Sequence, residues 1–388
     1  MPDFVNSSAS SQGYASPVDL DAPPTGPRQT QGAVNLQRGS FAHRWETAKQ
    51  IPQVGEPAIA DLITMLKDAS QSWETRWFAA RSLGHFDRPT VVTALIDALG
   101  TADEDLQEAI LEALSQIGPS AIAALSALVA DPTYQPVALA ALTRIPHPDT
   151  QAPLVAAVDL VTGATKAQVI EALGQFADLD LLPIFTEAVQ NRASSVRLAA
   201  LQGLIHLRTQ VDASRWVTWI QPLTEDVHPA VAQRAIHSLG RTTDLAATQT
   251  LQGLLVATHT PERLKIAAVQ ALSWQDTAAA LAVVIHAWDA LSQGVRIALV
   301  QGLSQLTSPS LKAQLSHPVQ EWLSALPATA DYSLLRRNLV MLLGQVGGDA
   351  AIPLLQDLSQ DADRGVRFHA AAALRLILGF TLAGAAAL

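Results

Sequence analysis

The sequence contains no cysteine, few aromatic residues and little charge. Without cysteine the chain cannot form disulfides, zinc fingers, catalytic thiolates or cysteine-ligated iron–sulfur clusters of its own. This composition fits a reducing compartment, and we expect a cytoplasmic protein. Aromatic residues make up 5% of the chain and charged residues 15%, whereas 49% is hydrophobic. Alanine and leucine dominate the hydrophobic share, which favours helices because unbranched side chains lose little rotamer freedom in a helix.

Basic residues are scarce, and they form no cluster. The net charge is −10, whereas a protein that binds nucleic acid needs a lysine- or arginine-rich face to replace counterions on the phosphates. We therefore expect no nucleic acid partner. The motifs GxGxxG, GxxxxGK, HExxH and GxSxG are also absent. The sequence thus predicts no catalytic residue, metal site or cofactor.

Long hydrophobic runs are nearly absent as well. The longest, Ala370–Leu388, is interrupted by Arg375, Gly379 and Gly384, and a charge near the middle of a membrane span is costly. We interpret it as a final buried helix followed by a small-residue tail at 380–388, and we expect no membrane span. Residues 1–40 are rich in Ser, Gln, Pro and Gly, without a helical period, which predicts a disordered extension.

What the chain does contain is one short unit that recurs about ten times. A leucine within an apolar segment marks each unit, and we call these residues the anchor leucines. They are Leu83, Leu114, Leu142, Leu173, Leu204, Leu239, Leu272, Leu303, Leu343 and Leu374. Most intervals are close to 31 residues, the length of two short helices and two turns. The sequence therefore predicts an all-α, right-handed superhelical solenoid of about ten helical hairpins over residues 41–379, with an insertion or an extra helical turn in the longer interval 303–343.

Basic residues recur seven positions before the anchor leucines. Examples are Arg76, Arg197, Arg296, Arg336 and Arg367. A cation near the start of a helix is unfavourable to the helix dipole, so each of these residues needs a partner. Turn residues thirteen positions before the anchors, among them Asn191, Asp226 and Asp361, are suitable partners. We predict a structural ladder that links each turn to the next.

The repeated patterns resemble a known family. Val-Arg pairs at Val196-Arg197, Val295-Arg296 and Val366-Arg367, and the ending Glu171-Ala-Leu-Gly174, are typical of HEAT repeats. The short period makes the chain more similar to HEAT-like repeats of the phycobilisome-lyase type. The resemblance covers roughly residues 43–378 and extends to long cyanobacterial HEAT-repeat proteins.

The resemblance implies several functions and leaves them open. Relatives include bilin lyases that act on phycobiliproteins, helpers of an A-type iron–sulfur carrier, and the di-iron enzyme deoxyhypusine hydroxylase. The hydroxylase needs His-Glu pairs as iron ligands, and no histidine of this chain precedes glutamate. We expect a non-catalytic protein-binding scaffold or assembly helper. The alternatives are a bilin lyase or lyase-like chaperone for phycobiliproteins, and a helper for an iron–sulfur carrier.

Two sets of residues are candidates for a protein-binding surface. Asp105, Glu108 and Glu112 form one helical stripe in a segment, 89–143, that has no Lys or Arg. Such a stripe suits a basic partner surface. The position two residues before each anchor should face outward, and in HEAT-like arrays the second helix of a hairpin lines the concave side. The outward candidates are Glu171, Gln202, His237, Gln270 and Gln301, and Trp77 lies beside this row. The alternative interpretations are an ordinary solvated surface for the polar residues and core packing for Trp77.

Overall fold

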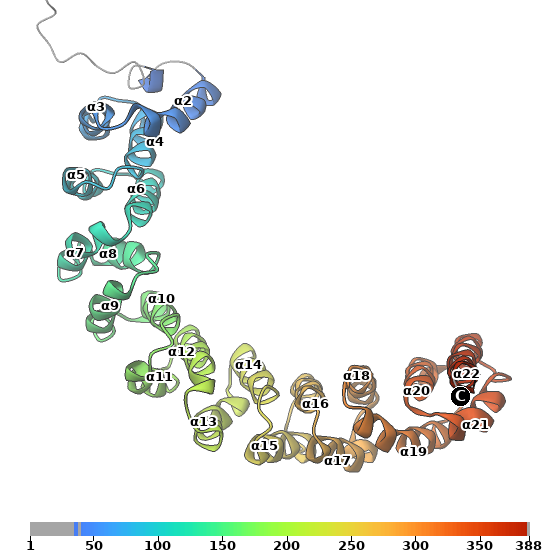
Figure 1. Ribbon diagram of the computed structural model, residues 1–388. Coiled ribbons are helices and arrows are strands. Elements are labelled where there is room, and N and C mark those ends of the chain that lie inside the picture. The colour runs from blue at the N-terminus through green and yellow to red at the C-terminus, as the bar shows by residue number, and fades with distance from the viewer. Residues whose placement is uncertain (1–34, 38–39, 386–388) are drawn as a thin grey trace, which may run out of the picture. The chain divides into compact units, whose positions relative to one another are not determined.

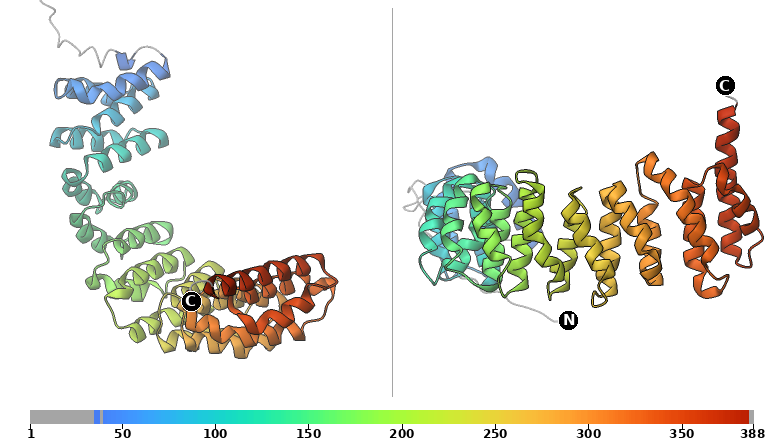
Figure 2. Two further views of the ribbon diagram at one scale, coloured as in Figure 1. Left: turned by 45° about the vertical axis from the view of Figure 1, so that its right-hand side comes forward. Right: turned by 90° about the horizontal axis from the view of Figure 1, so that it is seen from below.

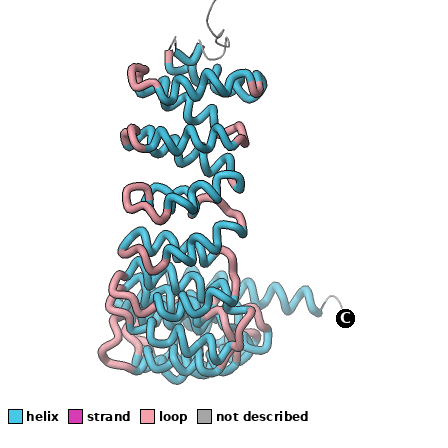
Figure 3. The backbone as a smooth tube through the Cα atoms, turned by 90° about the vertical axis from the view of Figure 1, so that its left-hand side faces the viewer, coloured by secondary structure: helices cyan, strands magenta, loops and turns pink. Residues whose placement is uncertain are grey.

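The computed structural model describes residues 35–37 and 40–385, with side chains up to Gly379. The predicted disordered extension at 1–40 therefore falls almost entirely outside the described residues. Within it, residues 35–37 are helical and Leu36 is fully buried. The described residues form helices and loops without a strand, as Figure 3 shows.

Ten helix pairs follow one another along the described chain, after an initial helix α2 (Phe41–Val54). The first helices of the pairs are α3 (Pro57–Lys67), α5 (Pro89–Leu99), α7 (Pro119–Leu128), α9 (Gln151–Ala157), α11 (Leu182–Ala188), α13 (Ala213–Ile220), α15 (Leu245–Val256), α17 (Ala278–Ala287), α19 (Pro309–Ala325) and α21 (Ile352–Leu358). The second helices are α4 (Trp73–Leu83), α6 (Glu104–Ile117), α8 (Gln135–Leu142), α10 (Gly163–Gly174), α12 (Ser194–His206), α14 (Pro229–Leu239), α16 (Glu262–Gln275), α18 (Gln293–Leu303), α20 (Ser333–Val346) and α22 (Arg364–Ala385). Every second helix carries one anchor leucine, as the repeat pattern predicts.

Local sequence signals set the helix ends. Ser72 and Asp103 cap α4 and α6: their side-chain oxygens accept a hydrogen bond from the backbone N–H of the third helical residue, at 3.3 Å and 2.9 Å. Gly118 follows α6 with φ of 75°, a left-handed conformation that favours glycine. Pro119 then begins α7 at a position where the missing N–H costs little.

The chain divides into two compact units, residues 1–124 and 125–388, and the division falls within α7. In the first unit α4 packs on α6, and each packs on the first helix that precedes it. In the second unit the second helices from α8 to α22 pack in succession. Figures 1 and 2 show α14, α16, α18, α20 and α22 as one layer of this unit, and the first helices α15, α17 and α19 as the other.

The anchor leucines form the core between these layers. From Leu83 to Leu343 each is at most 1% exposed. Leu374 differs, because it is half-buried, and Leu376 and Leu378 are each 44% exposed. The final helix is therefore buried on one side alone: among the described helices, none packs on the far side of α22. This helix also continues to Ala385, through most of the segment 380–388 predicted as a tail.

Small residues let neighbouring second helices approach closely. The residue after one anchor faces the residue before the next anchor, as in Gly84 against Ala113 and Gly240 against Ala271. A Cβ added to Gly84 would lie 2.8 Å from the Cα of Ala113, and one added to Gly240 would lie 2.7 Å from the Cα of Ala271. A side chain at these glycines would therefore push the helices apart.

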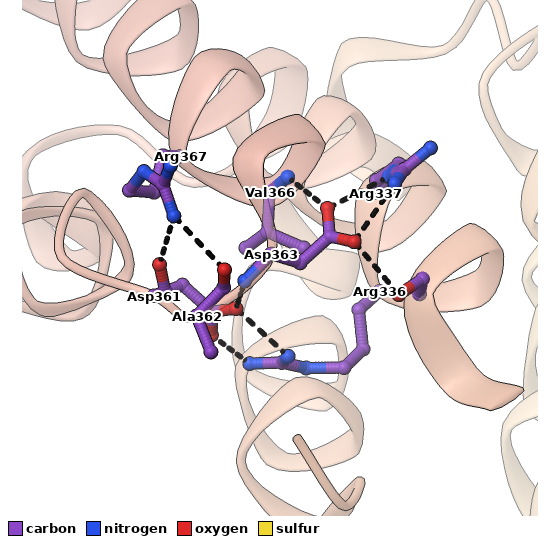
Figure 4. Close-up of polar contacts among 8 residues, drawn as sticks. Arg336, Arg337, Asp361, Ala362, Asp363, Val366 and Arg367 are labelled. Atoms are coloured by element: carbon purple, nitrogen blue, oxygen red, sulfur yellow. Dashed lines mark hydrogen bonds and ion pairs between the residues drawn. The ribbon is translucent and has the colours of Figure 1, made fainter. Parts of the chain in front are cut away.

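Two of the basic residues in the predicted ladder pair with a carboxylate in the turn that follows. The Arg197 guanidinium donates two hydrogen bonds of 2.6 Å to the Asp226 carboxylate in the next turn, and others to the carbonyls of Asn191 and Arg192. Arg336 pairs with Asp361 in the same way, and the Asp361 carbonyl accepts a hydrogen bond of 2.7 Å from Arg367 (Figure 4). Both arginines are nearly buried, so their role is structural.

The longer interval between Leu303 and Leu343 contains no separate domain. The helix α19 has 17 residues, with Pro318 inside it, and is followed by a loop and a short 3₁₀ turn at Ala330–Tyr332. The predicted extra helical turn is therefore present.

Candidate functional site

The anchor leucine of each second helix fixes which of its positions lie on the exposed side. Positions nine, six and two residues before the anchor leucine, and two residues after it, are exposed or half-buried in every second helix. We call these positions the second-helix face. All nine predicted binding residues lie on it: Trp77, Asp105, Glu108, Glu112, Glu171, Gln202, His237, Gln270 and Gln301. Their placement agrees with the outward direction predicted for them, except for Trp77, which the sequence places only beside the outward row. Binding remains a prediction for all nine.

In the first unit, aromatic rings gather where this face meets α2. The rings of Trp45 and Trp77 stack with centroids 6.2 Å apart, and Phe41 lies 6.1 Å from Trp45. The Arg81 guanidinium lies over both indoles, 4.9 Å from the Trp77 ring and 5.6 Å from the Trp45 ring. Trp77 also contacts buried Phe78 edge-on, so the side chain contributes both to packing and to the surface.

The acidic stripe adjoins this aromatic cluster. Asp105, Glu108 and Glu112 are exposed on α6, opposite the buried Ile110 and Leu114. Glu112 forms an ion pair with Arg81 across the two helices. The stripe therefore continues the surface that the tryptophans begin, and its Glu112 carboxylate is paired.

A hollow of about 580 Å³ lies between these groups. Its walls include Trp45, Lys49, Arg81, His85 and Glu112. The hydroxyls of Ser82 and Ser115 also border it and are buried without a hydrogen-bond partner in the described structure. The hollow thus combines an apolar wall, both signs of charge and unpaired hydroxyl groups.

In the second unit, the second-helix face has a larger hollow of about 700 Å³ over α10, α12 and α14. The predicted residues Glu171 and Gln202 line it, together with Leu198, which is 37% exposed. The amide of Gln202 is 2.7 Å from Nε2 of His206, whose Nδ1 is 2.7 Å from the Gly174 carbonyl oxygen. Since that carbonyl can only accept, Nδ1 carries the proton and Nε2 accepts from Gln202.

His237 on α14 contacts Gln270 on α16 through a side-chain hydrogen bond. Burial lowers the pKa of His237, the charges of Arg234 and Arg241 lower it further, and a hydrogen bond with Gln270 opposes the shift. The His237 ring contacts Trp274, with centroids 5.0 Å apart. Gln301 is exposed on α18, outside both hollows.

Sequence reasoning missed Trp45, Arg241 and Trp274. Trp45 lies on α2, which precedes the first anchor leucine, so the repeat register does not reach it. Arg241 and Trp274 lie two residues after their anchors, a row with the same outward direction as the row two residues before. Extending the register by one helical turn would have found them.

No group of three or more potential metal ligands occurs among the described side chains. Within the same part of the chain, no helix is both long and apolar enough to cross a membrane.

Comparisons with known proteins agree on the repeat type. A family model for HEAT repeats matches residues 59–145 and 217–304, and one for the PBS lyase HEAT-like repeat matches residues 335–361. Together they cover just over half of the chain. A comparison with curated protein sequences found no match.

Solved structures with a similar fold include karyopherins. A mutant of Kap121p aligns with a TM-score of 0.58 and 15% identity, over 93% of this chain and 47% of that one. Kap95p aligns with 0.55 and 12% identity, over 89% and 57%, and importin beta with 0.51 and 13%, over 88% and 57%. The chain thus spans about half the length of these proteins, and the likeness concerns the fold. The repeat pattern, the helix pairs and the matching models lead to one conclusion: the chain belongs to the HEAT-repeat proteins.

Proposed function

We propose that this chain is a non-catalytic scaffold that holds a partner protein on its second-helix face. The observation that carries the proposal is the surface around the hollow of the first unit. Trp45 is 36% exposed and Phe41 51% exposed, and the Arg81 guanidinium lies over the rings of Trp45 and Trp77 beside the acidic stripe. Tryptophan and arginine dominate the binding energy of protein interfaces, and water excluded from such a hollow strengthens their contacts.

The structural neighbours are consistent with this use of the fold. The solved structures include Kap121p bound to Pho4p and Kap121p bound to Nup53p. These complexes concern Kap121p. They support the proposal because an array of the same fold there holds a protein.

Charge reversal on the acidic stripe tests the proposal. In the variant Glu108→Lys with Glu112→Lys, we expect the main partner captured from an extract of the source cells to fall by at least about fivefold, because complementary charge steers and orients protein association. The matched control is Asp87→Lys with Asp97→Lys. It also reverses two exposed carboxylates, one of them ion-paired, but lies away from the second-helix face. Mass spectrometry quantifies the captured protein.

Circular dichroism and thermal melting establish that each variant is folded. The Arg81–Glu112 pair is half-exposed, so its loss should change stability by about 1 kcal/mol or less. Equal loss of the partner in both double variants would argue against a specific role of the second-helix face.

The identity of the partner is the finer part of the proposal. A phycobiliprotein subunit and an A-type iron–sulfur carrier are the two candidates that the repeat type suggests. The match of residues 335–361 to a PBS lyase HEAT-like repeat also motivates a test for bilin lyase activity. Mixing the chain with free phycocyanobilin should leave the absorbance of the pigment unchanged if the chain is a scaffold. A change in absorbance would favour the lyase.

A further inference from the structure

The second-helix face changes its charge along the chain. On α6 three of its four positions carry carboxylates, Asp105, Glu108 and Glu112. From α12 to α22 no position of the face carries Asp or Glu, whereas Arg241, Arg263 and Arg337 lie on it. In a chain of net charge −10, a face without carboxylates is a distinct electrostatic feature.

Two exposed arginines lie at this part of the face: Arg241 is on it, two residues after Leu239, and Arg234 is beside it on α14. The Arg234 guanidinium donates a hydrogen bond to the amide oxygen of Gln202, and the Arg241 guanidinium lies 5.0 Å from the centre of the Trp274 ring. Neither makes an ion pair within the described part of the chain. Both charges therefore face solvent and are available to an anionic group.

An aromatic platform and an apolar hollow adjoin these charges. Trp274 is 40% exposed and holds Arg241 against its ring. On the other side Arg234 borders the hollow of about 700 Å³, in which Leu198, Ala167 and Ala230 supply apolar surface. Burial lowers the pKa of His237 most, and the charges of Arg234 and Arg241 lower it further.

We propose that the second-helix face of α12, α14 and α16 binds a carboxylate-rich segment of a partner protein. Arg234 and Arg241 pair with its carboxylates, Trp274 packs against its aliphatic groups, and an apolar side chain enters the hollow at Leu198. This inference rests on the proposed scaffold function and specifies one partner segment. A polypeptide suits the site better than a nucleic acid, because separate arginines beside an apolar hollow do not form the continuous basic stripe that tracks a phosphate backbone.

Fluorescence anisotropy with a defined probe tests the inference on the full chain. The probe is a short fluorescein-labelled peptide of alternating glutamate and leucine, and the matched peptide has glutamine in place of glutamate. We expect the acidic peptide to bind at least about tenfold more tightly at low salt, with the difference shrinking as salt is added. The variant Arg234→Glu with Arg241→Glu should abolish the difference between the peptides.

The chain supplies a matched control within the same unit. Arg215 lies over Trp219 on α13, 5.4 Å from the ring centre, in the layer of first helices. The variants Arg215→Glu and Trp219→Ala should bind the acidic peptide as the unchanged chain does, whereas Trp274→Ala should weaken it. Melting curves establish that each variant is folded.

Three results would overturn the inference. They are equal affinity for both peptides, equal loss of peptide binding in Arg215→Glu and in Arg234→Glu with Arg241→Glu, or tighter binding of a single-stranded oligonucleotide than of the acidic peptide. These results differ from a failure of the scaffold proposal. If the acidic peptide does not bind but charge reversal at Glu108 and Glu112 still releases the cellular partner, this site alone is wrong. If no second-helix variant affects capture, the scaffold proposal fails as well.

Discussion

At the scale of single residues, the buried pair of Arg197 and Asp226 offers the sharpest test of the ladder. The side chains are 11% and 6% exposed, and removal of one partner leaves the other charge buried. We expect Asp226→Asn to lower the free energy of unfolding at pH 7 by about 3 kcal/mol, and the exposed control Asp97→Asn to lower it by about 1 kcal/mol or less. Urea unfolding monitored by circular dichroism measures both.

The pair of Arg197 and Asp226 also determines how the stability of the fold should depend on pH. Burial raises the pKa of Asp226, but hydrogen bonds from Arg197 and the His228 N–H, together with the Arg197 charge, hold it below its ordinary value. A carboxyl with a depressed pKa stabilises the fold above the unfolded pKa, near 4, and loses this contribution as the pH falls through the folded pKa. The difference in the free energy of unfolding between the unchanged chain and Asp226→Asn should therefore narrow below about pH 4. A constant gap down to acid unfolding would contradict this assignment.

At the scale of helices, the close approach of α14 and α16 depends on Gly240. An added Cβ would lie 2.7 Å from the Cα of Ala271 and 2.8 Å from its carbonyl oxygen. We expect Gly240→Ala to destabilise the fold by about 1–3 kcal/mol, because backbone atoms cannot move aside as a flexible side chain can. In the control Gly253→Ala, within α15, nothing lies within 4 Å, and the change should stabilise by about 0.5–1 kcal/mol. Similar effects in both variants would refute the packing argument.

The sequence predicts these helices well because the signals are local and repeated. The anchor leucines, the glycine before Pro119 and the small residues beside Leu239 each act through a neighbour at fixed spacing. Contacts between repeats are harder to predict. The position of Arg81 over Trp45 depends on α2, which lies outside the repeat register, and the pairing of Glu112 with Arg81 depends on side-chain conformation. The candidate face was therefore predictable as a row of positions, but its two hollows were not.

At the scale of the whole molecule, a repeat array should respond locally to a local change. The stability of such an array is approximately the sum of the intrinsic stabilities of its repeats and of the interfaces between neighbouring repeats. The periodicity of the sequence therefore predicts that distant repeats are only weakly coupled. The division into two units at 124/125 is not visible in the period, because the anchors Leu114 and Leu142 are 28 residues apart, close to the usual spacing.

Hydrogen exchange on the variant Asp361→Asn tests this local response. The substitution weakens the contact of Arg336 with the turn before α22, and Arg367 keeps its hydrogen bonds to the carbonyls of Asp361 and Ala362 (Figure 4). We expect amide exchange to rise in α20, α21 and α22, because α22 packs on the other two helices. Exchange should stay unchanged in α10 and α12, which belong to the same unit but do not pack on these three helices. Mass spectrometry of proteolytic peptides resolves these helices. A rise of equal size in α10 and α12 would mean that the second unit unfolds as one cooperative body, and that the ladder stabilises the array as a whole instead of joining one turn to the next.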